Sequence, residues 1–176
     1  MRIGVDIDGV IYPWHYSIYR YFTEFKGYSG TQVEFWKYFP SLPKNTQRYY
    51  VSLPFLYSNT IPSKSVFDAL DSLSTLGELF YVTARWSDDV KVVTRKFFKT
   101  HNPPFSENLI FDSDKATVCR MLGIDYFLDD QTKHLIPMQG FVKTYLMAQP
   151  HNVDDREGFT VVNSLKEFYD EITKSN

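Results

Sequence analysis

The stretch Arg2-Ile3-Gly4-Val5-Asp6-Ile7-Asp8-Gly9-Val10 places a short apolar run directly before two acidic residues and a glycine. An apolar run of this length that is followed by a turn signal is typical of a buried strand. We therefore predict a strand over Arg2 to Val10 that ends in a turn at Asp8-Gly9. Two carboxylates then lie where the strand ends, and this end of the strand is the first candidate site of the chain.

From residue 63 onwards, the predicted helices and strands alternate along the chain. Ser63 is expected to cap a helix that Gly77 ends, Asp114 to cap a helix that ends at Gly123, and Ser164 with Glu167 to form a capping box for the last helix. Another helix is predicted over Asp88–Thr100. Strands are predicted over Leu79–Thr83, Leu109–Phe111, Tyr126–Leu128, Phe141–Met147 and Thr160–Val162. This spacing fits βαβ units and predicts an α/β fold, with a Rossmann-like, mostly parallel sheet covered by helices.

The segment 12–62 interrupts this alternation directly after the first strand. It holds 16 of the 31 aromatic residues of the chain and is broken by Pro40, Pro43, Pro54 and Pro62, with candidate helices over Tyr16–Phe25 and Thr31–Tyr38. We interpret it as a small helical, aromatic-rich cap inserted into a catalytic core. The predicted division is therefore a catalytic core of residues 1–11 and 63–176 and an inserted cap of residues 12–62.

Composition limits the class of protein. The chain has 176 residues, 43% of them hydrophobic and 23% charged, and a net charge of −2. A nucleic-acid binder normally has a basic excess, so no nucleic-acid polymer is expected as a partner. The early acidic residues argue against a signal peptide, and no apolar run is long enough to span a membrane. With a single cysteine, Cys119, these features predict a cytoplasmic protein with no membrane partner; they do not indicate its oligomeric state.

Polar side chains collect at the ends of the predicted strands. In an open parallel sheet, ligands bind at the carboxyl edge, and the residues expected there are Asp6, Asp8, Thr83, Lys115, Asp129 and Asp130. Neighbouring carboxylates repel each other unless a cation or a proton compensates them. Mg²⁺ prefers oxygen ligands and often bridges one or two carboxylates to a substrate phosphate. The sequence therefore predicts Mg²⁺ as the cofactor and a phosphorylated small molecule as the substrate.

These residues form four motifs that occur in the same order as in the haloacid dehalogenase (HAD) superfamily of phosphatases. The chain resembles this superfamily over almost its whole length. Asp6-Ile7-Asp8-Gly9-Val10 resembles the first motif, Thr83 the second, Lys115 the third and Asp129-Asp130 the fourth. The resemblance implies a phosphomonoesterase in which Asp6 attacks phosphorus and forms an aspartyl-phosphate.

The same resemblance implies roles for the other residues. Asp8 would protonate the leaving oxygen and then activate water, while Thr83, Ala84 and Lys115 would hold the phosphoryl oxygens. Asp6, the backbone carbonyl of Asp8 and one residue of the Asp129-Asp130 pair would bind the metal. Asp129 is the preferred direct ligand because it leaves the strand first, and Asp130 is the alternative.

Each element also has an ordinary structural interpretation. Asp8-Gly9 can be a simple turn, Thr83 a β-branched strand residue, Lys115 a solvated lysine at a helix start and the Asp129-Asp130 pair a helix cap. A lysine in the first turn of a helix opposes the macrodipole, so a nearby anion would explain it; its removal is expected to cost little stability. The four histidines, His15, His101, His134 and His151, show no spacing typical of a metal site or of a partner for a nucleophile, and no role is predicted for them.

The predicted cap must select the leaving group. Aromatic faces stack on nucleobases, and the candidate contacts are Trp14, Phe35, Trp36, Tyr38, Tyr49 and Tyr50. The alternative is that these rings fill the core of the cap. The early aromatic segment, the Asp129-Asp130 pair and the run Gln149-Pro150-His151-Asn152 also resemble the 5′(3′)-deoxyribonucleotidase family, which implies a nucleoside monophosphate as substrate. Arg85 replaces the proline expected after the second motif and is a candidate contact for a second anionic group, or a surface arginine.

Three other functions fit parts of this pattern. One is a HAD phosphatase acting on another small metabolite such as a sugar phosphate. Another is a signalling receiver, in which the acidic pair comes early in the chain rather than late, and which lacks an aromatic insertion. The third is a non-catalytic binding module on the same fold, against which the complete set of motifs argues.

Overall fold

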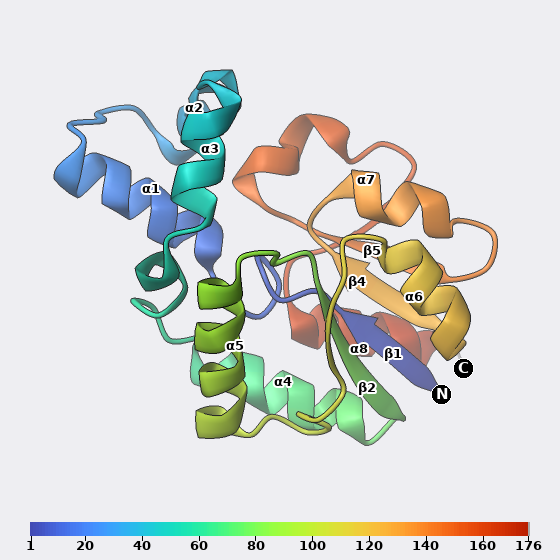
Figure 1. The fold of residues 1–176 in the computed structure, drawn as a ribbon. Coiled ribbons are helices and arrows are strands. Elements are labelled where there is room, and N and C mark those ends of the chain that lie inside the picture. Colours follow the sequence, from blue (N-terminus) through green and yellow to red (C-terminus); the bar gives the residue numbers. More distant parts are fainter. Residues whose placement is uncertain (176) are drawn as a thin grey trace.

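A six-stranded parallel sheet forms the centre of the protein in the computed structural model, which describes residues 1–175. The strand order is β3-β2-β1-β4-β5-β6, and every neighbouring pair is parallel (Figure 1). The strands are β1 (Arg2–Val5), β2 (Glu78–Thr83), β3 (Leu109–Phe111), β4 (Tyr126–Asp129), β5 (Lys143–Met147) and β6 (Thr160–Val162). The predicted fold class is thus confirmed.

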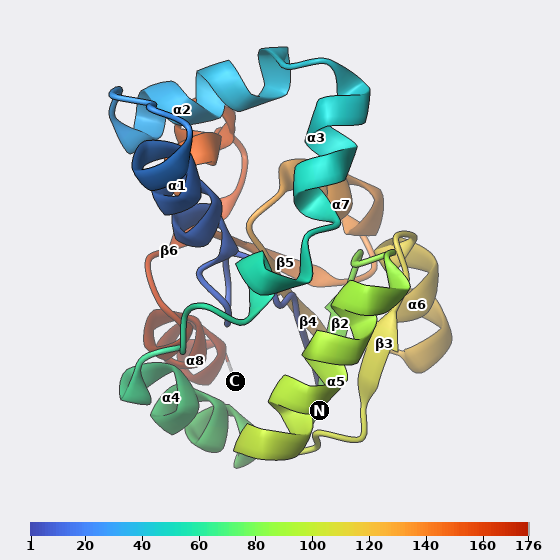
Figure 2. The ribbon, with the colours of Figure 1, turned by 60° about the vertical axis from the view of Figure 1, so that its left-hand side comes forward.

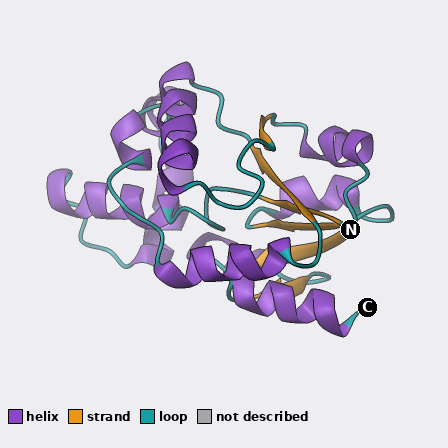
Figure 3. Ribbon diagram, turned by 90° about the horizontal axis from the view of Figure 1, so that it is seen from below, coloured by secondary structure: helices purple, strands orange, loops and turns teal. Residues whose placement is uncertain are grey.

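Helices cover both faces of the sheet (Figure 3). Alternate residues of β2 point to opposite sides, so that Leu79 and Tyr81 join one buried cluster and Phe80 and Val82 join the other. The first cluster is closed by α4, α5 and α8, and the second by α6 and α7. These helices are α4 (Lys64–Ser74), α5 (Asp88–His101), α6 (Lys115–Leu122), α7 (Thr132–Leu135) and α8 (Leu165–Lys174).

The segment between β1 and α4 is helical and lies beyond the carboxyl ends of the strands (Figures 1 and 2). Thr31 and Glu34 form a capping box at the start of its second helix. Phe22, Phe35 and Phe39 pack together inside the segment, with ring centroids 5.1–5.9 Å apart. Its elements are α1 (Trp14–Phe25), α2 (Gln32–Tyr38), α3 (Lys44–Val51) and the 3₁₀ turns Phe39–Ser41 and Pro54–Tyr57.

Several element ends differ from those predicted. β1 stops at Val5 because the backbone then turns, and the amides of Ile11 and Tyr12 both donate to the carbonyl of Ile7. α4 ends at Ser74 rather than at Gly77, and the Ser63 hydroxyl bonds to that of Ser65 instead of capping the helix.

Two further differences lie in the last third of the chain. β5 begins at Lys143 and not at Phe141. At α8, Ser164 accepts from the Glu167 amide as predicted, but the Glu167 carboxylate accepts from the amide of Asn163, so the predicted capping box is only half formed. Two short 3₁₀ helices, Ile136–Met138 and Pro150–Asp155, complete this part of the chain.

The strand order places a switch point between β1 and β4. From β1 the chain proceeds to β2 and β3 on one side, and then returns to β4 on the other side of β1. Loops that follow two such strands diverge and leave a crevice at the carboxyl edge. None of the helices formed by residues 1–175 has the length and apolar character that a membrane crossing needs.

Candidate active site

Asp6 and Asp129 lie side by side at this switch point. Val5 of β1 is in register with Leu128 of β4, and the Asp6 amide donates to the Leu128 carbonyl at 2.9 Å. Because Val5 is paired with Leu128, the residues that follow them, Asp6 and Asp129, lie at the same edge of the sheet. The sequence pattern of two apolar strands ending in aspartate therefore brings two carboxylates together.

Lys115 joins these two carboxylates. Its ammonium lies 2.7 Å from Asp6 Oδ1 and 2.7 Å from Asp129 Oδ2, and its side chain is 1% exposed. The lysine is the first residue of α6, where Asp114 accepts from the Thr117 amide as the helix cap. The surface interpretation of Lys115 is therefore wrong. Because breaking a buried charge pair is costly, the loss of Lys115 is now expected to reduce stability.

The charges at this edge perturb one another strongly. Burial raises the pKa of Asp6 to about 7; Lys115 opposes this rise, and the Asp129 carboxylate adds to it. Burial alone would lower the pKa of Lys115, but the Asp129 and Asp6 carboxylates raise it above its ordinary value. The site thus holds a permanent cation beside a carboxylate that is costly to ionise without further positive charge.

The surroundings of Asp130 indicate that this site binds an additional positive charge. Both of its carboxylate oxygens are buried and accept no hydrogen bond from residues 1–175. Burial raises its pKa well above the ordinary value, and the nearby Asp129 and Asp6 charges add to the rise. Asp6, Asp129 and Asp130 each offer an oxygen within 4.8 Å of the others. A hard divalent cation fits this set of oxygen donors.

Asp129 is less available for a cation than Asp130. One Asp129 oxygen accepts from Lys115, and the other accepts from the amide of Gln131 at 2.9 Å. Gly9 leaves space for the Asp130 carboxylate, because a Cβ at Gly9 would overlap Asp130 Oδ2. Its φ of +76° is one that glycine adopts readily. Of the two candidate ligands, Asp130 therefore has the oxygens that are not engaged by hydrogen bonds from the described residues.

Two histidines that the sequence did not single out lie against Asp130. His15 Nδ1 is 3.3 Å and His151 Nε2 is 3.4 Å from Asp130 Oδ2, and burial lowers the pKa of both imidazoles. Their rings are stacked, with centroids 4.1 Å apart and planes at 23°. His15, Asp130 and His151 form a second group whose possible ligand atoms lie within 4.8 Å of one another. His15 and His151 are 136 positions apart in the sequence, and no spacing rule connects them.

Asp8 does not join the cluster of Asp6, Asp129 and Lys115. Its carboxylate accepts two hydrogen bonds from Arg85, at 2.6 Å from Nη2 and 2.9 Å from Nε. Arg85 is buried, so the interpretation as a surface arginine is wrong. The guanidinium binds Asp8, itself a residue of the predicted site, and no local sequence pattern indicates this contact.

A cavity of about 200 Å³ lies beside Asp8, between the core and the inserted segment. Ala84 and Arg85 line it from the core, and Trp14 and Tyr57 from the inserted segment. Trp86, which is half exposed and which the sequence analysis did not name, also lines it. Trp14 and Tyr57 are stacked at 5.8 Å. The cavity thus adjoins one residue of the predicted catalytic pair and has aromatic walls.

The other candidate aromatics are placed differently. Phe35 is fully buried in the inserted segment, and Trp36 packs against His15 and His151, with ring centroids at 4.8 and 5.6 Å. Tyr38 stacks on Tyr28 and is partly exposed. The two tyrosines of α3 also lie elsewhere: Tyr49 is exposed and Tyr50 packs on Phe22. Of the six candidates, only Trp14 lines the cavity beside Asp8.

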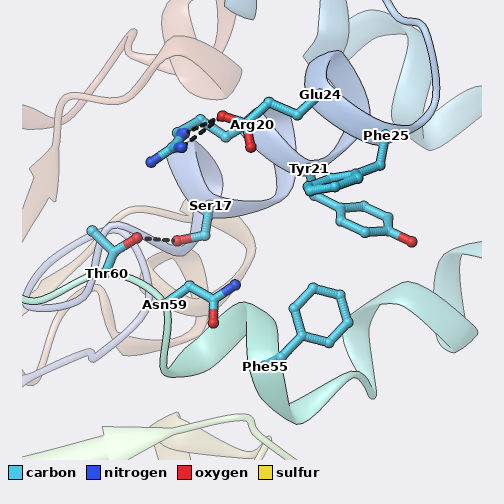
Figure 4. Close-up of a pocket in the computed structure, with 8 residues that line it drawn as sticks. All are labelled: Ser17, Arg20, Tyr21, Glu24, Phe25, Phe55, Asn59 and Thr60. Carbon is cyan, nitrogen blue, oxygen red and sulfur yellow. Dashed lines mark hydrogen bonds and ion pairs between the residues drawn. The ribbon is translucent and has the colours of Figure 1, made fainter.

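Thr83 ends β2, where it is fully buried, and its hydroxyl lies 3.4 Å from the Arg85 amide. β2 neighbours β1, so Thr83 shares the carboxyl edge with Asp6. A separate cavity of about 300 Å³ lies between α1 and residues 55–60 (Figure 4). Its walls hold none of the predicted site residues; they are Ser17, Arg20, Tyr21, Glu24, Phe25, Phe55, Asn59 and Thr60.

Comparison with solved structures places this fold in a known class. A haloacid dehalogenase-like hydrolase from Burkholderia xenovorans is 12% identical, with 98% of this chain and 96% of that chain covered and a TM-score of 0.64. CbbY from Rhodobacter sphaeroides, solved with phosphate, is 11% identical, with 95% of each chain covered and a TM-score of 0.59. L-2-haloacid dehalogenase from Xanthobacter autotrophicus is 10% identical, with 99% of each chain covered and a TM-score of 0.55.

The fold is therefore that of the HAD-like hydrolases. Within this class, the chain belongs to the family described as 5′ nucleotidase, deoxy (pyrimidine), cytosolic type C protein, whose model matches residues 1–176. It is accordingly a hydrolase of phosphoric monoesters. No curated protein sequence matches the chain significantly.

Proposed function

We propose that the protein is a Mg²⁺-dependent 5′-nucleotidase that hydrolyses nucleoside monophosphates, with deoxyribonucleotides as good candidates, through an aspartyl-phosphate on Asp6. The observation that carries this proposal is the Lys115 ammonium bridging Asp6 and Asp129 at the switch point, with the unpartnered Asp130 carboxylate beside them. A nucleophile, a fixed cation and free oxygen ligands are the parts that phosphoryl transfer needs.

The reaction divides into two displacements. An Asp6 oxygen attacks phosphorus, the bond from phosphorus to the ester oxygen breaks, and Asp8 gives its proton to that leaving oxygen. Asp8 then takes a proton from water as the water oxygen attacks phosphorus, which releases inorganic phosphate and restores Asp6. Lys115 stabilises negative charge on the phosphoryl oxygens in both steps. Thr83 and Ala84, at the end of β2, would bind the same oxygens.

Mg²⁺ would be held by Asp6, the Asp8 carbonyl and Asp130, with Asp129 serving mainly to hold Lys115. When bound, it supplies positive charge that offsets the repulsion between carboxylates and phosphate. This assignment is supported by the two orphaned Asp130 oxygens and by the Asp129 oxygens that are already engaged.

Residues 12–62 would act as the cap that selects the leaving group. Support comes from the cavity beside Asp8, where Trp14 and Tyr57 of this segment face Ala84 and Arg85 of the core. A base entering between these walls can stack on an aromatic face, with Trp86 at the edge of the same cavity. The small-molecule substrate would thus be recognised partly by its base and partly by its phosphate.

The substrate preference can be measured by competition. We expect a nucleoside 5′-monophosphate to be hydrolysed about tenfold or more efficiently than ribose 5-phosphate, since one base–aromatic stack contributes ~1–3 kcal/mol. Trp14→Ala and Trp86→Ala should reduce this ratio. Phe25→Ala, which alters an exposed ring outside the cavity, should leave it unchanged. Equal efficiencies for the two substrates in the wild type would favour a sugar phosphatase instead.

Lys115→Met should impair both chemistry and folding. Methionine fills the volume of the lysine stem, so the loss reports on the charge; breaking a buried ion pair costs about 3–5 kcal/mol. The melting temperature should fall, and Mg²⁺ should restore part of it by neutralising the same carboxylates. Lys133→Met, a lysine in α7, is the control. Normal kinetics and an unchanged melting temperature in Lys115→Met would remove the lysine from the site.

A further inference from the structure

The Arg85 guanidinium is held by several neighbouring side chains. Arg85 directly follows Thr83 and Ala84, which are predicted to bind phosphate. Its Nε and Nη2 donate to the two oxygens of Asp8, and Nη1 donates to Thr94 Oγ1 at 2.7 Å. The Thr94 hydroxyl in turn donates to the Val90 carbonyl of α5 at 2.7 Å. The guanidinium also lies over the Tyr57 ring, 4.6 Å from its centroid. The arginine thus connects Asp8 to the core helix α5 and to the inserted segment.

We propose that Arg85 is a positioning residue that holds the Asp8 carboxylate in one orientation at the cavity wall. A guanidinium that binds both oxygens of a carboxylate fixes its plane as well as its place, which a single hydrogen bond does not do. The Asp8 side chain remains 19% exposed, whereas that of Arg85 is 3% exposed. Arg85 therefore covers one side of the Asp8 carboxylate, and part of the Asp8 side chain remains exposed to solvent.

This arrangement argues against Arg85 as a binding residue for a second anion of the substrate. Three of its donors are already engaged, and an incoming anion would have to displace Asp8 from the fork. A second anion would also have to reach a side chain that is almost wholly buried. In the proposed reaction, the Asp8 carboxyl group gives a proton to the leaving oxygen and later takes one from water. Both transfers require that its orientation be fixed.

The inference rests on the proposed phosphatase function of Asp8, and it predicts a dependence on the leaving group. A nucleoside leaves as an alkoxide unless it is protonated, whereas p-nitrophenolate leaves readily without a proton. A poorly oriented Asp8 should therefore slow hydrolysis of the nucleotide much more than that of p-nitrophenyl phosphate. Binding of phosphate should be little affected, because Arg85 does not take part in it.

The test compares Arg85→Met with wild type on both substrates with Mg²⁺ present. Methionine keeps much of the packing against Tyr57 and leaves Asp8 partly solvated instead of burying an unpaired charge. Because positioned acid–base groups contribute ~10²–10⁴-fold, we expect kcat on the nucleotide to fall about 10–100-fold, and kcat on p-nitrophenyl phosphate about threefold or less. KM and inhibition by inorganic phosphate should stay near wild type. Arg95→Met, which changes an exposed arginine of α5, is the matched control.

Two further variants keep the test decisive. If Arg85→Met does not fold, as judged by circular dichroism, Thr94→Val removes only the Nη1 contact and should give the same leaving-group pattern at smaller size. Arg85→Met added to Asp8→Asn should cause no further loss, because residues that act as a unit are not additive.

Equal losses on the two substrates, or a raised KM with unchanged kcat, would overturn the positioning role. A wild-type protein that hydrolyses neither substrate would instead overturn the proposed function. Hydrolysis by the wild type together with a leaving-group-dependent loss in Arg85→Met would support the inference.

Discussion

Asp6→Asn is expected to lower phosphate release by about 10⁴-fold or more while the protein remains folded. The amide is nearly isosteric with the carboxylate, but it cannot act as the nucleophile toward phosphorus. Lys115 keeps its ion pair with Asp129 in this variant, so the buried ammonium is not left unpaired. Steady-state release of inorganic phosphate from a nucleoside monophosphate, with circular dichroism and a thermal melt of the same sample, measures both outcomes.

Asp68→Asn provides the matched control for this substitution. Asp68 is exposed on α4 and pairs only with Lys64 among the residues described, so its kinetics should equal those of wild type. Activity of Asp6→Asn within a few-fold of wild type would exclude Asp6 as the nucleophile. Loss of both activity and the cooperative melt would be uninformative about chemistry, and the same comparison would then be made with Asp6→Ser, which is smaller and uncharged.

Removal of Mg²⁺ should lower turnover by about 10³-fold, since metal ions contribute several kcal/mol to such transition states. Activity should return when Mg²⁺ is added in excess of the chelator. Without the cation, Asp6, Asp129 and Asp130 face one another, and the Lys115 ammonium contacts two of the three carboxylates. Undiminished turnover in chelator, after dialysis against it, would contradict this prediction.

The two acidic residues of the fourth motif should behave differently in a Mg²⁺ titration. Asp130→Asn removes a buried carboxylate that has no hydrogen bond, so it should raise the Mg²⁺ requirement and raise the melting temperature of the metal-free protein. Asp129→Asn takes a partner from Lys115 and should lower that melting temperature. If Asp129→Asn, and not Asp130→Asn, raised the Mg²⁺ requirement, Asp129 would be the direct ligand.

The sequence was sufficient for the fold because each strand carries a local signal. Short apolar runs bounded by glycine, proline or aspartate define β2, β3 and β4 almost to the residue. The carboxyl-edge rule then brings Asp6 and Asp129 together without any knowledge of packing. The end of β1 was harder to predict, because Ile7 and Val10 are apolar and buried and continue the strand pattern although the backbone has already turned.

Contacts between distant segments could not be predicted in the same way. His15 at the start of α1 and His151 in the 3₁₀ helix Pro150–Asp155 both lie against Asp130, and no local pattern encodes this meeting of distant segments. Arg85 was expected to face the substrate or solvent, and its bond to Asp8 depends on the turn that carries Asp8 away from Asp6. The aromatic segment was correctly expected to be helical, but the ring that lines the cavity could not be distinguished from those that fill its core.

The most direct test of the proposed mechanism is to trap the phosphorylated enzyme. Asp8→Asn should slow hydrolysis of the intermediate more than its formation when the leaving group is p-nitrophenolate, so the phosphoenzyme should accumulate. After rapid mixing with p-nitrophenyl phosphate and Mg²⁺, acid quenching and peptide mass spectrometry, one phosphoryl group should be found on Asp6, and it should be absent from the Asp6→Asn protein. Turnover of p-nitrophenyl phosphate by Asp8→Asn with no phosphoryl group on Asp6 at any time would contradict the mechanism.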